Sequence, residues 1–468
     1  MFQRPLGGIE TGMSSVLAAA NPREPLRIQA WADFTAPYTQ DEVTTAFRGA
    51  WQALRLLKSP DIAATIEDGK KCYKVPTAQD LLLWLDETFT IAEQGTSPDE
   101  AIRNAHEKFD PLSLCQVLPQ STDDNTFKGS VLLLISHWRT EASGAYMMIN
   151  QLFDYALDIL EGTSTRLALQ THASGSEVDL LTPVLDDILM PNKESTPEAK
   201  ERIEKHFAEY YEHLPSIDFP ITGDISAPAT NDMAYQRVYT SSSTTAIVRA
   251  CKSASVSVTA AIHAAYIGSV WKIVDPAHRS RSYASLMPAQ VRTRLPPASP
   301  HRHNGCWDAA RGLMLHVPSG LDFVERAQML RSQYALADSP QWLHEDIREV
   351  AVQMLKGPPS YLDPQPASMP WFTSFGVLDR DKESGVIVPE HGGMKIDNVS
   401  AWADNVGPGI VMTVWTFRGR LNVQVSWNLA FHTEEQVGGL MDLVDEELTG
   451  GLGIELKVEE VRGKGCLY

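Results

Sequence analysis

The chain has 468 residues, of which 43% are hydrophobic, as is ordinary for a folded protein. This length exceeds what one core usually fills, so we expect two or three domains, or one domain built of two similar halves. The formal net charge is −19 and the pI is near 5.1. Nucleic acid and anionic membranes both require a basic surface, so we expect neither as a partner.

No segment has the pattern of a secretion signal or a membrane span. The first residues, MFQRPLGGIETGMSS, contain no apolar stretch, and no window approaches 18 uninterrupted apolar residues. The 5 cysteines are scattered, with no pair at metal-ligand spacing, which is typical of reduced thiols. We therefore expect a cytoplasmic protein with no metal.

The first half of the chain alternates strands and helices. Residues 26–34 predict a strand, and residues 40–57 predict an amphipathic helix with its apolar side chains on one side. Thr77 opens a further capped helix. Residues 131–135 have no polar member and predict a buried strand, and helical spacing follows over 145–160.

The middle of the chain is polar and rich in proline from Arg166 to about Ser243, with one clear helix over 197–213. Such a change of composition is typical of a domain boundary. We therefore divide the chain into an N-terminal half, residues 1–215, a linker, residues 216–240, and a C-terminal half, residues 241–468.

The second half has a similar alternation. Two helices around a short turn are expected over 242–274, a strand that runs into a basic loop over 281–295, and a helix over 320–336. Residues 408–431 predict a β-hairpin, and residues 431–448 predict a closing capped helix. Strands interleaved with helices throughout predict an α/β or α+β fold.

A histidine and a carboxylate follow the buried strand of the first half. His137 comes at the end of the strand, and Glu141 comes four residues later, before a turn of small residues. An imidazole between a strand and a helix is held rigidly, as a general base must be. A second match to this spacing, His106 with Asp110, lies in a charged segment, where a solvated helix end is the simpler interpretation.

The motifs of several other enzyme classes are missing. The sequence has no Gly-x-Ser-x-Gly, no Cys-x-x-Cys, no His-Glu-x-x-His and no phosphate-binding glycine loop. Hydrolase, redox, zinc-protease and kinase functions are therefore disfavoured. Acyl transfer from a thioester needs a base and little water but no separate nucleophile, so it agrees with what is present.

The order of these features resembles that of the condensation-domain and BAHD acyltransferase superfamily. The strand-His-x-x-x-acid-x-x-Gly-helix unit, the segment VRACKSASVSVTAAIHAAYIGSV, the basic SLMPAQVRTRLPP and the closing hairpin and helix come in the same order. The resemblance covers roughly residues 25 to 450. Within the superfamily, the chain is most similar to fungal O-acetyltransferases of secondary metabolism, of the trichothecene acetyltransferase type.

The resemblance implies two chloramphenicol-acetyltransferase-like halves around a central tunnel, with His137 at its middle. In such enzymes the histidine is the general base for an acceptor hydroxyl or amine that attacks an acyl thioester. His137 and Glu141 are thus the candidate catalytic residues. The family acid usually pairs with an arginine that keeps the histidine loop in shape, and here the expected partner is Arg292 or Arg294.

Substrate contacts are predicted at five further residues. Trp138 is a candidate to line the acceptor pocket, and Ser374 is a candidate to donate a hydrogen bond to the developing oxyanion. Because CoA carries phosphates, its entrance should be basic, and Lys252, Arg279 and Arg281 are the candidates.

The sequence departs from the family pattern at the motif itself. In the form of the motif with two consecutive histidines, Ser136 occupies the position of the first. Glu141 replaces Asp, and Ala142 stands where a glycine often follows the acid. The family's Asp-Phe-Gly-Trp-Gly run is missing. Residues 371–379, WFTSFGVLD, are either its local counterpart or only a strand and a turn.

These observations together predict an acyl-CoA-dependent O-acyltransferase, first of all an acetyltransferase, that acts on a hydroxyl of a hydrophobic secondary metabolite. Acyl-CoA would be a cosubstrate, with no bound cofactor. Two alternatives stay open: a cyclase or amide-forming enzyme that uses a carrier-bound acyl group, and a non-catalytic binding protein. A chain of two similar halves has less need of a partner, so a monomer is expected.

Overall fold

The computed structural model describes residues 1–19, 26–106, 113–123, 125–189, 195–292, 295, 299, 301–308, 310–339, 341–356, 366–379 and 386–463. The chain divides into two compact units, each assembled from three separate stretches. The first unit comprises Met1–Ile188, Arg292–Ala309 and Leu378–Asp404. The second comprises Leu189–Val291, Ala310–Val377 and Asn405–Tyr468.

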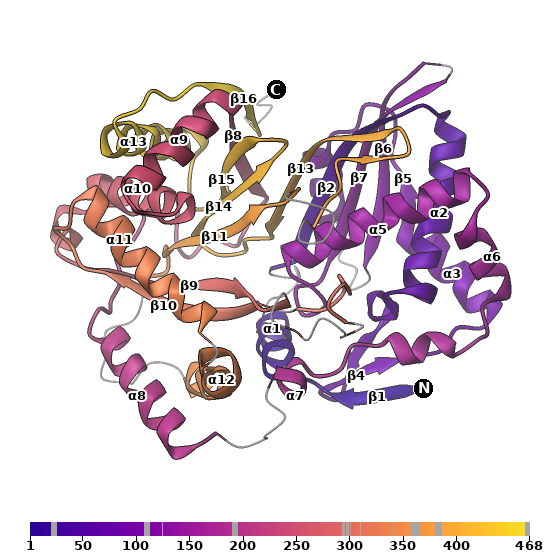
Figure 1. Ribbon diagram of the computed structural model, residues 1–468, viewed down its shortest axis with the longest axis horizontal. Helices are drawn as coiled ribbons and strands as arrows, with labels where there is room; N and C mark the ends of the chain where they lie inside the picture. The colour runs from indigo at the N-terminus through magenta and orange to yellow at the C-terminus, as the bar shows by residue number, and fades with distance from the viewer. Residues whose placement is uncertain are drawn as a thin grey trace. The chain divides into compact units, whose positions relative to one another are not determined.

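A six-stranded sheet forms the centre of the first unit, in the order β12-β13-β2-β7-β6-β5. Its strands are β2 (Ile28–Ala36), β5 (Phe89–Ile91), β6 (Leu114–Asp123), β7 (Thr126–Ile135), β12 (Glu390–His391) and β13 (Met394–Ala403). All neighbouring pairs are antiparallel except β5 with β6. Helices α2 (Gln40–Leu57) and α5 (Ala142–Leu160) lie together against this sheet (Figure 1).

Smaller elements complete the first unit. They are β1 (Phe2–Pro5), α1 (Gly8–Ala19), η1 (Pro60–Ala63), β3 (Thr65–Glu67), β4 (Lys70–Tyr73), α3 (Ala78–Thr88), α4 (Pro98–His106), α6 (Ser164–Thr171), η2 (Ser176–Leu180) and α7 (Leu185–Leu189). Strands β1, β4 and β3 form a separate three-stranded sheet.

Local sequence explains the main helices and the central strand of the first unit. A capping box of Thr39 and Glu42 starts α2, whose bounds are those predicted from its periodicity. Its apolar side, which includes Phe47 and Trp51, is fully buried. The apolar run Val131–Ile135 forms the buried end of β7, as predicted.

The last strand of this sheet comes from far along the sequence. Strand β13 pairs antiparallel with β2, so that Ala401 lies opposite Ala30 and Ser400 opposite Trp31. A sheet edge left unpaired would expose a row of backbone hydrogen-bonding groups, and β13 covers that edge of β2. The first unit is therefore incomplete without residues that follow most of the second.

The second unit contains a five-stranded sheet in the order β11-β14-β15-β8-β16 and a separate hairpin of β9 and β10. Its strands are β8 (Asp232–Tyr239), β9 (Tyr283–Gln290), β10 (Ala310–Val317), β11 (Pro370–Val377), β14 (Ile410–Phe417), β15 (Arg420–Asn428) and β16 (Val458–Arg462). Its helices are α8 (Pro197–Tyr211), α9 (Ser241–Ser253), α10 (Val258–Ile273), η3 (Pro276–His278), α11 (Phe323–Tyr334), η5 (Ala335–Asp338), η6 (Trp342–Asp346), α12 (Ile347–Lys356) and α13 (Glu434–Leu452).

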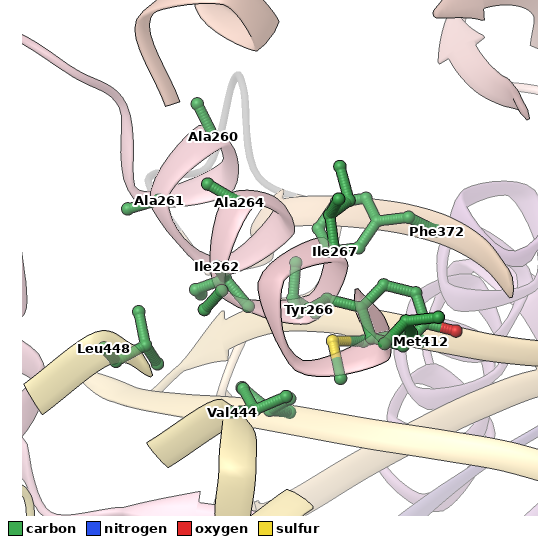
Figure 2. Packing of buried hydrophobic residues seen from close by; sticks show 14 of the residues in the cluster. Ala260, Ala261, Ile262, Ala264, Tyr266, Ile267, Phe372, Met412, Val444 and Leu448 are labelled. Atoms are coloured by element: carbon green, nitrogen blue, oxygen red, sulfur yellow. The ribbon is translucent and has the colours of Figure 1, made fainter. Parts of the chain in front are cut away.

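Helix α10 is the centre of the core of the second unit. It is buried on all sides from Ala260 to Val270 and lies between α11, α13 and the strand β11. Figure 2 shows Ile262 directed toward Val444 and Leu448 of α13, and Ile267 beside Phe372 of β11. The two helices predicted over 242–274 are present as α9 and α10.

The predicted hairpin over 408–431 is formed by β14 and β15. Its turn lies at Arg418 and Gly419, which both have positive φ, 51° and 70°. Two such residues make the kind of tight turn that matches the twist of paired strands.

The predicted division of the chain requires correction. Residues 216–240, expected to be a linker, contain strand β8, which pairs with both β15 and β16. The first stretch of the first unit ends at Ile188 and not at residue 215. The unit also includes two later stretches, Arg292–Ala309 and Leu378–Asp404. The reason is that the buried polar side chains of Gln236 and Arg237 interrupt the apolar residues of β8, so no apolar run marks this strand in the sequence.

Among the described residues, no single helix is long and apolar enough to cross a membrane, and only the bent pair α9 and α10, which meet at 94°, passes a test of length and composition.

We predict that Ile267→Ala lowers the free energy of unfolding by about 2–5 kcal/mol, because it leaves a cavity beside α10 that the packed core cannot close. Urea unfolding followed by circular dichroism measures this. Val248→Ala on α9 is the matched control, because that side chain is 50% exposed, and it should change the unfolding free energy little. Equal effects of the two substitutions would contradict this description of the core.

Candidate active site

His137 lies in a turn between β7 and α5, where the apolar strand ends and the helix begins. The backbone N–H of Arg139 donates to the carbonyl of Ser136 at 2.9 Å and closes the turn. The Arg139 guanidinium also donates to the Ser136 hydroxyl at 2.8 Å. Ser136, which occupies the position of the first of the two histidines in the family motif, therefore stabilises the turn that contains His137.

The closest charged partner of His137 is Asp308. The distance from His137 Nδ1 to Asp308 Oδ2 is 3.1 Å, with the histidine side chain 19% exposed and the aspartate side chain fully buried. Burial alone would lower the pKa of His137. The hydrogen bond and negative charge of Asp308, together with a hydrogen bond to the backbone of His137 itself and the charge of Glu141, outweigh it. The pKa of His137 is raised above its usual 6.5.

Glu141 is held by an arginine. Arg292 Nη2 donates to both carboxylate oxygens of Glu141, at 2.7 and 2.9 Å, and both side chains are buried. The same guanidinium donates to the backbone carbonyls of Asn304 and Trp307. Of the two arginines expected to hold the acid, Arg292 lies against it, whereas Arg294 is outside the described residues.

The segment 301–308 packs directly on the first turn of α5. The Thr140 hydroxyl donates to the carbonyl of Gly305 at 2.7 Å. A Cβ at Gly144 would lie 2.3 Å from the Gly305 carbonyl oxygen, and one at Gly305 would lie 2.5 Å from that of Gly144. No side chain fits between these backbones. Gly144, rather than Ala142, is thus where the motif requires a glycine.

Trp138 is buried among cations. The guanidinium of Arg139 lies 4.2 Å from the centroid of its ring, and the ammonium of Lys71 lies 5.6 Å from it. Both distances are within the range of cation–π attraction. These contacts of Trp138 are those of a packing residue. Its role in lining an acceptor pocket stays a prediction.

Lys71 connects this site to a buried ionic cluster. Its ammonium lies 2.8 Å from Asp61 and 2.9 Å from Glu10, and Glu10 also binds Arg4. Burial opposes ionisation of Glu10, but the charges of Lys71 and Arg4 outweigh it and lower the pKa of Glu10 to about 2. Glu10 therefore stays ionised at neutral pH.

The remaining candidates lie in the second unit. Ser374 is on β11, next to a bulge in its pairing with β14, and its hydroxyl is 3.2 Å from that of Thr259 on α10. Lys252 is exposed at the last turn of α9, Arg279 is exposed after η3, and Arg281 is half-buried before β9. Their roles toward a donor or an oxyanion stay predictions. The run 371–379 is mainly the strand β11.

Sequence reasoning missed Asp308. It is 171 residues from His137, and it ends a polar segment, SPHRHNGCWD, that no motif of the sequence analysis included. One signal in the sequence pointed to it. Because Arg292 was expected to pair with Glu141, the segment that follows Arg292 and contains Asp308 had to lie close to the motif.

No cluster of three or more His, Cys, Asp or Glu side chains in the described part of the chain is arranged to hold a metal ion. His137 and its partners can accept, hold and return a proton at one imidazole nitrogen. That is the chemistry of a general base.

Comparison with known proteins shows which fold and which sequences this chain is similar to. The fold matches that of TRI3 trichothecene 15-O-acetyltransferase from Fusarium sporotrichioides, with a TM-score of 0.78, 14% sequence identity, and coverage of 95% of this chain and 94% of that one. No family model matches the chain. The structural match confirms the mixed α/β fold class predicted from the sequence.

Two fungal proteins are similar in sequence. The chain is 25% identical to the O-acetyltransferase pigM of Monascus ruber over 447 residues, which cover 92% of this chain and 82% of pigM. It is 26% identical to the acetyltransferase pigO of the same organism over 470 residues, with coverage of 97% and 96%. The predicted resemblance to fungal acetyltransferases of secondary metabolism is confirmed. The chain is an enzyme of the acyltransferase class.

We predict that Glu141→Ala lowers the free energy of unfolding by about 3–5 kcal/mol, because Arg292 would then be buried without its partner. Chemical denaturation measures this. Asp86→Ala is the matched control, since the Asp86 pair with Arg48 is exposed (68% and 36%) and such pairs contribute about 0–1 kcal/mol. A Glu141 variant as stable as the control would show that the ion pair does not hold the site together.

Proposed function

We propose that this chain is an acyl-CoA-dependent O-acyltransferase that transfers an acetyl group to a hydroxyl of a small hydrophobic secondary metabolite. The observation that carries the proposal is His137, a partly exposed imidazole at the end of a buried strand, with its Nδ1 against Asp308 and its pKa above 6.5. The similarity to pigM and pigO supports acetyl transfer, and the name of pigM supports an oxygen acceptor.

The proposed reaction uses His137 twice. Nε2 takes the proton from the acceptor hydroxyl as its oxygen attacks the carbonyl carbon of the thioester. The tetrahedral intermediate then collapses, the carbon–sulfur bond breaks, and the leaving thiolate takes the proton back from Nε2. An ester and free CoA thiol are formed, and the imidazole returns to its starting state.

Glu141 has no proton to exchange in this proposal. Both of its oxygens accept charge-assisted hydrogen bonds from Arg292. Its contribution is to keep the first turn of α5 against the segment 301–308. Glu in place of Asp at position 141 would therefore be compatible with activity, because Arg292 reaches the longer side chain.

Two alternatives make different predictions. A cyclase or amide-forming enzyme would use an acyl group on a carrier protein and would not release CoA thiol. A non-catalytic protein would not need a charged imidazole at His137. The burial of the Asp308 carboxylate beside it would then cost folding free energy and serve no function. The second alternative is thus the weaker one.

We predict that His137→Ala lowers acetyl transfer by about 100-fold or more, because general-base catalysis contributes roughly 10² to 10⁴ in rate. The assay measures CoA thiol released from acetyl-CoA with a panel of hydrophobic alcohols. His172→Ala is the matched control, since His172 lies in the same unit and also pairs with a buried carboxylate, that of Glu177 at 3.0 Å. Full turnover by a folded His137 variant would place the base elsewhere.

We predict that acetyl-CoA binding weakens as salt rises, because its phosphates would bind cationic side chains at the entrance. The double variant Arg279→Gln, Arg281→Gln should bind acetyl-CoA roughly tenfold more weakly. Calorimetric titration at two ionic strengths measures both effects. Lys205→Gln, at a position that is 78% exposed on α8, is the control. Absence of binding at either ionic strength would favour a carrier-bound donor.

A further inference from the structure

The acid that faces His137 is not the acid of its own motif. Glu141, four residues after the histidine, directs both oxygens to Arg292. Asp308, 171 residues away, lies 3.1 Å from Nδ1 of the imidazole. The two carboxylates therefore have separate partners and separate roles.

The contact with Asp308 determines which nitrogen of His137 carries the hydrogen. An ionised carboxylate can only accept a hydrogen bond, so Nδ1 must be the donor. In the neutral imidazole the lone pair is then on Nε2. The Asp308 side chain is fully buried, so water does not compete for this hydrogen bond.

The segment that carries Asp308 is itself fixed at several points. The Asn304 side chain accepts hydrogen bonds from the Ser59 hydroxyl at 2.7 Å and from the backbone N–H of Cys306 at 3.0 Å. The carbonyl of Trp307, the residue just before Asp308, accepts from Arg292 at 2.6 Å. A carboxylate on so rigid a segment can orient a neighbouring ring precisely enough for proton transfer.

We propose that Asp308 is the positioning residue of this enzyme: it fixes His137 in the tautomer with Nε2 free and stabilises the imidazolium that forms when Nε2 takes a proton. This inference deepens the proposed function and rests on His137 as its general base. Asp308 never touches the acceptor or the donor. Its effect reaches the reaction only through the imidazole ring.

The charges around His137 agree with this assignment. Burial is the largest influence on its pKa and lowers it, and the hydrogen bond and charge of Asp308 act in the opposite direction. A hydrogen bond with the backbone of His137 itself also raises the pKa, and so does the charge of Glu141, which is the smallest of these effects and belongs to a carboxylate paired with Arg292. The cation of Arg139, in the same turn, lies over Trp138. Loss of the Asp308 charge should therefore lower the pKa of His137.

The test is a ¹⁵N NMR titration of the histidine side chains in the full chain, with His137 assigned by its absence in His137→Gln. In the unaltered protein we expect the neutral ring to carry its hydrogen on Nδ1 and to titrate above pH 6.5. In Asp308→Asn we expect titration below 6.5. In acetyl transfer, kcat should fall by about 100-fold, with the rising limb of the pH profile shifted to lower pH.

Asp154→Asn is the matched control. Asp154 pairs with His391 Nδ1 at 2.8 Å in the same unit, so the substitution makes the same chemical change in another His–Asp pair. It should leave the titration of His137 and the rate unchanged. A similar loss of rate in both variants would indicate a structural effect only, and would overturn the proposal.

The titration separates this inference from the proposed function. An unaltered protein whose neutral His137 carries its hydrogen on Nε2 would overturn the inference, even if Asp308→Asn fails to fold. An Asp308→Asn protein with an unshifted His137 titration would also overturn it, whatever its activity. If the expected NMR behaviour occurs in a protein that transfers no acyl group, the role of Asp308 toward His137 stands and the proposed reaction fails.

Discussion

The buried ion pair between Glu141 and Arg292 is the interaction on which the candidate site depends. It joins residues 151 positions apart, and the same guanidinium binds two backbone carbonyls of the segment 301–308. Burial of two charges costs free energy that the pair alone does not always recover, and the two additional hydrogen bonds help to offset it. The result is that the turn with His137 and the segment with Asp308 are held against each other by one side chain.

The charges around this turn balance one another. Eight buried charged side chains, four positive and four negative, lie in the contacts described above: Arg4, Lys71, Arg139, Arg292, Glu10, Asp61, Glu141 and Asp308. The charges of these eight side chains sum to zero, whereas the chain as a whole has a net charge of −19. In such surroundings the ionisation of His137 responds to its nearest partner and not to the overall acidity of the chain.

The features that could be predicted from the sequence are those that short segments determine. The helix Gln40–Leu57 and the end of β7 follow from local periodicity and apolar runs, and the position of His137 follows from them. Strand β8 was missed because its sheet positions include Gln236 and Arg237, which are buried through long-range partners such as Asp445 on α13. Asp308 was missed because no spacing rule relates residues that meet only when a distant segment returns, and the expected pairing of Arg292 with Glu141 pointed to this segment only indirectly.

The return of β13 to the first sheet has a consequence for how the chain is made. Residues 394–403 complete the edge beside β2, so the first unit lacks this strand until these residues have left the ribosome. Until then the edge of β2 is open to pairing with other chains. Contacts of such large sequence separation also form slowly, because a long loop must close first. Truncated forms that end before residue 394 should therefore aggregate rather than fold.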